Sequence, residues 1–244
     1  MPNELTTVVV AALLLASAAG GAIQGVVGFG FALVAVPALT LAEPEAVPVT
    51  VMLMALPMTV VMALRERHHI DVGGFATIMA GRVIGIAAGV VVLSLVPEGA
   101  LSVLVGAMIL LGVLLSVVGL DIKPTPWANV GAGALSGIMG TTSAIGGPAL
   151  AVVYQRRPGP ELRSTLALSY LAGIVLAVGA LAAVGRVHIW HVVLALELVP
   201  GLLFGLWLSF RLARVLDQTW LRPAVLVFAA AAGGVIIVRA AIGT

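Results

Sequence analysis

Three adjacent hydroxyl residues interrupt a long apolar stretch of this 244-residue chain: Thr141, Thr142 and Ser143. Gly146 and Gly147 follow them, and Pro148 suits the first turn of a new helix, where no backbone N–H is needed. The free N–H groups and aligned peptide dipoles at a helix start attract anions, and glycine lets a ligand approach the backbone. The pattern predicts an oxyanion site made of neutral donors at a break between two helices.

A second glycine-rich break lies earlier in the chain, within residues 21–37. Aligning residues 25–28 with residues 137–140 superposes a Gly-x-x-Gly motif from each break. At this first break the sequence predicts a turn and one neutral amide as candidate ligands: Gly28, Phe29, Gly30 and Gln24. The alternative at both breaks is close packing of helices through small residues spaced four apart.

Two ionisable residues lie deep in apolar segments. Arg82 is about ten residues into its expected span, roughly 15 Å at 1.5 Å per residue, and Glu197 lies at a similar depth in another. Charges inside a membrane are costly, so each residue is a functional hypothesis by default. Arg82 would complete an anion site and Glu197 would carry a proton. The alternative is a structural ion pair between the two.

The composition indicates a membrane protein. Hydrophobic residues make up 61% of the chain and charged residues 9%, and the mean hydropathy is +1.22. The charges are clustered, and most intervals between clusters can hold the ~20 apolar residues that span a bilayer. We therefore expect contact with the lipid bilayer and no nucleic-acid partner. Without cysteine, or any visible catalytic, metal or cofactor motif, we expect no enzyme activity, no metal and no cofactor.

The apolar segments form two similar halves. Residues 1–122 hold a broken segment at 5–42, interpreted as half-helices at 5–24 and 31–42, and expected spans at 46–64, 72–96 and 99–120. Residues 123–244 hold a broken segment at 127–155 and expected spans at 164–185, 188–209 and 221–241. Short motifs shared in the same order indicate an old duplication, in which Arg82 aligns with Leu202 rather than with Glu197.

The distribution of arginine and lysine favours one topology. If each broken segment crosses the membrane once, the loop charges divide five against six, which is no bias. If each dips in and returns to its own side, nine fall on one side and two, Arg186 and Arg239, on the other. The second arrangement gives the expected positive excess in the cytoplasm, with both termini outside. It predicts an all-α polytopic membrane protein of two inverted repeats, each a re-entrant helical hairpin plus three transmembrane helices.

The motifs at the two breaks resemble those of the TauE/SafE sulfite-exporter family, also called the toluene-sulfonate uptake permeases. The likeness rests on GVVGFG at residues 25–30 followed by Pro37, and on SGIMG at residues 136–140 followed by IGGP at 145–148. It covers essentially the whole chain. Members are small bacterial inner-membrane proteins with two homologous halves, implicated in moving sulfite, sulfonates and related organic anions. The resemblance therefore implies an inner-membrane location and a small anionic substrate.

These observations predict a secondary transporter of small sulfur-containing or organic anions. It would export them by alternating access, with Glu197 as the candidate for proton coupling. The expected binding residues are Gln24, Gly28, Phe29, Gly30, Arg82, Thr141, Thr142, Ser143, Gly146 and Gly147. A passive anion channel lined by both hairpins is the alternative function, and a homodimer is left open.

Overall fold

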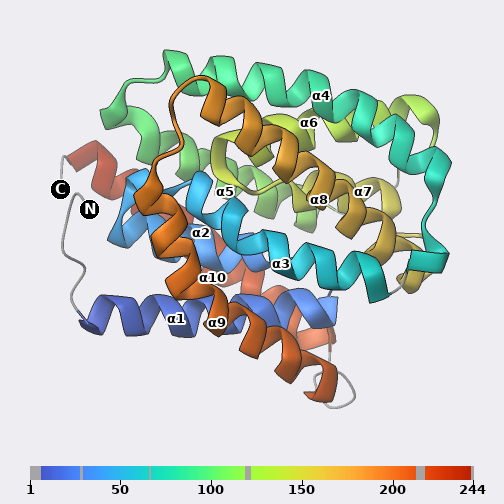
Figure 1. Ribbon diagram of the computed structural model, residues 1–244, viewed down its shortest axis with the longest axis horizontal. Coiled ribbons are helices and arrows are strands. Elements are labelled where there is room, and N and C mark those ends of the chain that lie inside the picture. The colour runs from blue at the N-terminus through green and yellow to red at the C-terminus, as the bar shows by residue number, and fades with distance from the viewer. Residues whose placement is uncertain (1–6, 28–29, 66, 119–121, 213–217, 243–244) are drawn as a thin grey trace.

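The structure is a computed structural model that describes residues 7–27, 30–65, 67–118, 122–212 and 218–242. Within these residues the fold is all-helical, as the sequence predicts, with ten α-helices and three short 3-10 helices. Most of the helices run back and forth along the long axis of the molecule (Figure 1). The start of α1 and the end of α10 lie at the same end of this bundle (Figure 1).

The helices follow the expected order. The first five are α1 (Thr7–Val27), α2 (Phe31–Ala42), α3 (Val49–Arg65), α4 (Val72–Leu95) and α5 (Leu101–Val117). The next five are α6 (Pro126–Ser143), α7 (Gly147–Tyr154), α8 (Gly159–Ala183), α9 (Ile189–Leu212) and α10 (Gln218–Ile242). The 3-10 turns are Pro44–Ala46, Arg67–His69 and Glu98–Ala100. The six expected spans correspond to α3–α5 and α8–α10, with ends displaced by a few residues.

In the part of the chain that the structure describes, five helices are long and apolar enough to cross a membrane: α1, α4, α8, α9 and the Pro223–Ile242 part of α10. The apolar helices α3 and α5 have 17 residues each, which is the lower limit for a span. The first arm expected at 5–24 corresponds to α1, displaced by two to three residues. α1 continues through Gly25 to Val27, and its 21 residues extend for about 31 Å at 1.5 Å per residue.

Each broken segment folds back on itself as a helical hairpin. Gly20 of α1 lies against Phe31, the first residue of α2. Gly146, between α6 and α7, lies against Ser136, ten residues earlier in α6. α6 ends at a left-handed residue, Ala144, whose φ is 60°. These contacts support the hairpin interpretation of each break, with a long first arm and a short second arm.

The second hairpin packs along α4 through glycines. Gly85 of α4 lies directly against the carbonyl of Ala134 in α6, so a Cβ at this position would collide with the facing oxygen. Three more glycines of the pair make similar contacts with the facing backbone: Gly81, Gly133 and Gly137. Figure 1 shows the two helices side by side. We call this contact the α4–α6 interlock.

The first hairpin packs along α9 in the same way. Gly205 of α9 lies against the carbonyl of Ala18, and Gly21 of α1 lies against the carbonyl of Leu202. Gly25 and Gly201 extend this α1–α9 interlock. At the glycines of both interlocks, the structure therefore supports the alternative of close helix packing.

The interlocks predict which glycines tolerate a methyl group. Gly85→Ala and Gly205→Ala should each destabilise the fold by about 1–3 kcal/mol, because the added Cβ overlaps a carbonyl oxygen of the facing helix. Gly131→Ala in α6 and Gly179→Ala in α8 are matched controls, with open space around the position. They should be neutral or stabilise the helix by up to about 1 kcal/mol. Thermal unfolding of the purified variants tests this, and equal losses of Tm at all four positions would contradict the interlocks.

Candidate anion-binding site

A cavity lies where the two helix breaks meet. Residues 30–33, at the start of α2, and residues 144–148, at the connection from α6 to α7, both line it. Residues of α1, α3, α4, α6 and α8 complete the wall. The volume is about 70 Å³, whereas one water needs roughly 10–15 Å³ by a comparable measure. This central cavity can therefore hold a small polyatomic ion.

Arg82 of α4 supplies the positive charge of the central cavity. The residue is only 4% exposed, and its Nη1 donates a hydrogen bond of 3.2 Å to Oγ of Ser136 in α6. The guanidinium carbon lies 5.9 Å from the ring centre of Tyr170 in α8, within cation–π range. The guanidinium fills the space beside Gly173, where any Cβ would collide with it. Two neighbouring helices thus hold the cation at the cavity.

Two buried polar atoms of the cavity lining have no hydrogen-bond partner among the described residues. They are Nε of Arg82 and Oγ1 of Thr141, and Thr141 is 0% exposed. A buried polar group without a partner costs about 1–3 kcal/mol, and more when it is charged. Both atoms can donate a hydrogen bond, so an anion in the cavity would give each of them a partner.

The start of α7 also borders the cavity. Gly146 and Gly147 both line it, and Pro148 occupies the first turn of the helix. The carbonyl of Gly147 accepts a hydrogen bond of 3.4 Å from the hydroxyl of Tyr170. The structure therefore brings Arg82, Thr141 and the two glycines of the predicted set to one place.

The other two hydroxyls of the set bond to their own helix. Oγ1 of Thr142 donates to the carbonyl of Ile138 at 2.9 Å. Oγ of Ser143 donates to the carbonyl of Met139 at 2.8 Å. Neither Thr142 nor Ser143 is among the residues that line the cavity.

At the first break, Gln24 and Gly30 both line the cavity. Oε1 of Gln24 accepts a hydrogen bond of 3.1 Å from the backbone N–H of Phe31, so this amide caps the start of α2. Gly30 has a φ of 123°, a conformation that side chains disfavour. The predicted ligands Gly28 and Phe29 lie outside the described residues.

Glu197 lies away from the central cavity. It is exposed on α9, which packs against α1 and α3, whereas α4 packs against α6 and α8. Arg82 is buried on α4, and no ion pair joins these two described residues. The structural ion pair considered as an alternative is therefore not formed.

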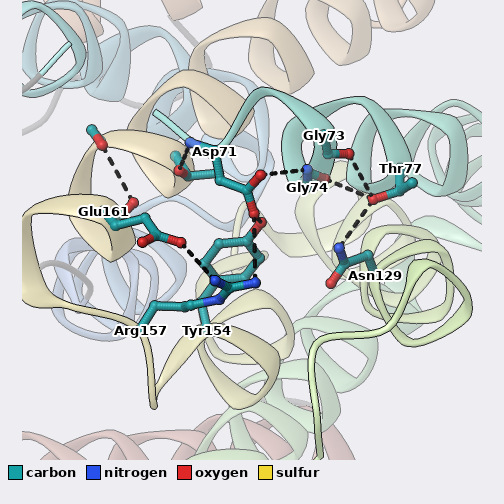
Figure 2. A network of polar contacts seen from close by, with 10 residues as sticks. Asp71, Gly73, Gly74, Thr77, Asn129, Tyr154, Arg157 and Glu161 are labelled. Atoms are coloured by element: carbon teal, nitrogen blue, oxygen red, sulfur yellow. Dashed lines mark hydrogen bonds and ion pairs between the residues drawn. The ribbon is translucent and has the colours of Figure 1, made fainter. Parts of the chain in front are cut away.

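A polar network holds the start of α4 to the second hairpin (Figure 2). Oδ1 of Asp71 accepts a hydrogen bond of 2.9 Å from the N–H of Gly74 and caps α4. Oδ2 of Asp71 accepts one of 2.9 Å from the hydroxyl of Tyr154, at the end of α7. Arg157 lies 3.9 Å from the same carboxylate and 3.3 Å from Glu161.

These contacts change the acidity of the Asp71 carboxyl. The Gly74 N–H, and after it the Tyr154 hydroxyl and the Arg157 cation, hold the pKa of Asp71 below its ordinary value of 3.8, against an opposing effect of burial. The carboxylate form is thus stabilised by the folded chain.

Sequence reasoning gave no role at the site to Ser136 and Gly173, which look like ordinary small residues of apolar segments. For Tyr170 it considered a place at the site but favoured core packing. All three residues contact the Arg82 side chain. Only the packing of α4 against α6 and α8 brings them to the guanidinium. The one signal in the sequence was Arg82 itself, because a buried arginine requires polar partners on neighbouring helices.

The fold and the cavity define a helical membrane protein with a buried cation between two helix breaks. The family model of the sulfite exporter TauE/SafE matches residues 13–236, and the chain belongs to this family. It is therefore an integral membrane protein of an anion-transport family, as the motifs at the two breaks predicted. No curated protein and no solved structure matches the chain.

The Asp71 network predicts a loss of stability in acid. The pKa of this carboxyl is lower in the folded than in the unfolded chain, so its contribution is complete above about pH 4 and is lost as the pH falls through the folded pKa. Asp71→Ala should also cost about 0.5–2 kcal/mol at neutral pH by removing the helix cap. Unfolding of wild type and Asp71→Ala between pH 3 and 7 tests this. The difference between the two stability curves should shrink as the pH falls below about 4. A constant difference between them would contradict the prediction.

Proposed function

We propose that this chain is a secondary transporter that binds a small sulfur-containing or organic anion in the central cavity. One observation carries the proposal: Nε of Arg82 and Oγ1 of Thr141 are buried donors on the wall of one cavity, and neither has a partner among the described residues. An anion would accept a hydrogen bond from each of these two donors, and the start of α7, which has no side-chain cap, would add its backbone dipoles. Membership of an anion-transport family supports the same substrate class.

The proposed binding residues are a subset of those expected from the sequence. They are Arg82, Thr141, Gly146, Gly147, Gly30 and Gln24, all on the cavity wall. Thr142 and Ser143 are left out, because their hydroxyls already bond to carbonyls of α6. In this proposal Gln24 and Gly30 shape the start of α2, while Arg82 and Thr141 contact the anion.

Alternating access between two inverted repeats is the mechanism we propose. The packing pattern supports it: α6 of the second hairpin packs on α4 of the first half, and α1 of the first hairpin packs on α9 of the second half. Each hairpin is thus held by the opposite half. One unit would then be the second hairpin with α4, and the other the first hairpin with α9. Relative movement of these two units would open the cavity first to one side of the membrane and then to the other. A passive channel would need both hairpins to line a continuous pore.

Proton coupling through Glu197 stays a prediction. The carboxylate is the one acidic residue within the spans expected from the sequence, but it lies on the exposed face of α9. To test this role, pH-gradient-driven uptake is measured in liposomes that contain the Glu197→Gln protein. Uptake should lose its dependence on the pH gradient, whereas unchanged pH-driven uptake would exclude Glu197 from coupling.

Binding and counterflow measurements test the proposed site. Arg82→Gln should weaken binding of methanesulfonate, an anion of the proposed class, by about 10- to 100-fold, as expected for a hydrogen-bonded charge. Thr141→Val should weaken it by about three- to tenfold. Thr142→Val and Ser143→Ala are matched controls with little expected effect, since their hydroxyls bond within α6.

The same proteins in liposomes distinguish a transporter from a channel. The wild type should show saturable uptake and counterflow of labelled methanesulfonate, and Arg82→Gln should need about 10- to 100-fold more substrate for the same uptake. Current that follows voltage without counterflow would favour the channel. Full binding by folded Arg82→Gln and Thr141→Val would rule out the site.

A further inference from the structure

We propose that the central cavity selects a monoanion with an apolar group over a dianion. This inference rests on the proposed function and narrows its substrate class to molecules such as organic sulfonates, in which one oxyanion head carries one charge. Two independent features of the cavity wall support it: its charge and the distribution of its donors.

The charge of the wall matches one negative charge. Among the described residues that line the cavity, Arg82 is the one cation, and Tyr170 is the one other ionisable residue. A monoanion would be neutralised by the guanidinium. A dianion would keep one uncompensated charge in a site enclosed by apolar side chains, which is strongly unfavourable.

The free donors are few. Among the described residues of the wall, Nε of Arg82 and Oγ1 of Thr141 are the buried side-chain atoms without a hydrogen-bond partner. The backbone N–H groups at the start of α7 add donors at the same break as Thr141. Thr59 donates to the carbonyl of Leu56 at 2.9 Å, and Tyr170 donates to that of Gly147 at 3.4 Å. Gln24 accepts from the start of α2. The free donors therefore come from Arg82 and the second break, and they can serve one end of an oxyanion.

The remaining wall is apolar. One face of α3 and the neighbouring turns of α8 supply Val51, Met52, Ala55, Met58, Ile174 and Ala177. An oxygen turned toward these side chains would find no donor, whereas a methyl or ethyl group there would be favourably buried. Methionine side chains are flexible and fit apolar groups of different shape. The wall thus favours a ligand with an apolar end opposite its charged end.

A matched pair of anions tests the proposal. Methanesulfonate and sulfate have similar size and tetrahedral geometry, but methanesulfonate replaces one oxygen of sulfate with a methyl group and carries one charge less. Calorimetric titration of the full-length protein in nanodiscs, at constant ionic strength, measures both affinities. Methanesulfonate should bind at least about tenfold more tightly than sulfate. Equal or tighter binding of sulfate would overturn the proposal.

Chain length tests the apolar wall separately. Ethanesulfonate should bind about fourfold more tightly than methanesulfonate, the effect of burying one CH₂ group. Ala55→Leu narrows the apolar part of the cavity and should abolish this preference for ethanesulfonate. Ala87→Leu, on the exposed face of α4, is the matched control and should retain it. Retention of the preference by folded Ala55→Leu would contradict the assignment of this wall.

The outcomes separate this inference from the proposed function. If sulfate binds as tightly as methanesulfonate and Arg82→Gln weakens both, the anion site stands and the selection of a monoanion fails. If neither anion binds to the folded wild type, the site itself fails, and the selectivity proposal falls with it.

Discussion

Close contact between helix backbones at glycine positions is the constraint on which this structure depends. Arg82 lies between Gly81 and Gly85, two α4 glycines that meet the backbone of α6. This contact brings the guanidinium within reach of Ser136 and of the break that follows α6. Gly173 of α8 leaves the space that the guanidinium fills. Larger residues at these glycines would separate the helices and remove the cation from the cavity.

The two interlocks are similar, but the residues that they position differ. Gly133 lies against the carbonyl of Ile78 and the N–H of Arg82, and Gly21 lies against the carbonyl of Leu202 and the N–H of Leu206. By this correspondence Arg82 is equivalent to Leu206. The sequence alignment paired Arg82 with Leu202, one helical turn earlier. Leu206 is buried and apolar. The hydroxyl of Thr141 likewise comes from the second hairpin alone. A repeated scaffold would therefore carry a single, asymmetric anion site.

The sequence was sufficient to predict the order of the helices, the two breaks and a buried arginine, which the structure places on the cavity wall. Long charge-free segments define helices in a membrane, and a buried arginine among them requires a polar partner. Which hydroxyls face the cavity could not be predicted, since Thr141 and Thr142 are adjacent and only the helix rotation separates them. Neither could the role of the interlock glycines, because composition alone does not distinguish close packing from ligand access.

Protection of a single cysteine by substrate tests most directly whether the anion binds between the two breaks. The natural chain contains no cysteine, so Ala32→Cys at the start of α2 places a unique thiol on the cavity wall. Saturating methanesulfonate should slow its alkylation, while the thiol of Ser94→Cys, on an exposed part of α4, should react at an unchanged rate. Binding of methanesulfonate with no change in the alkylation rate at position 32 would place the anion elsewhere and contradict the account.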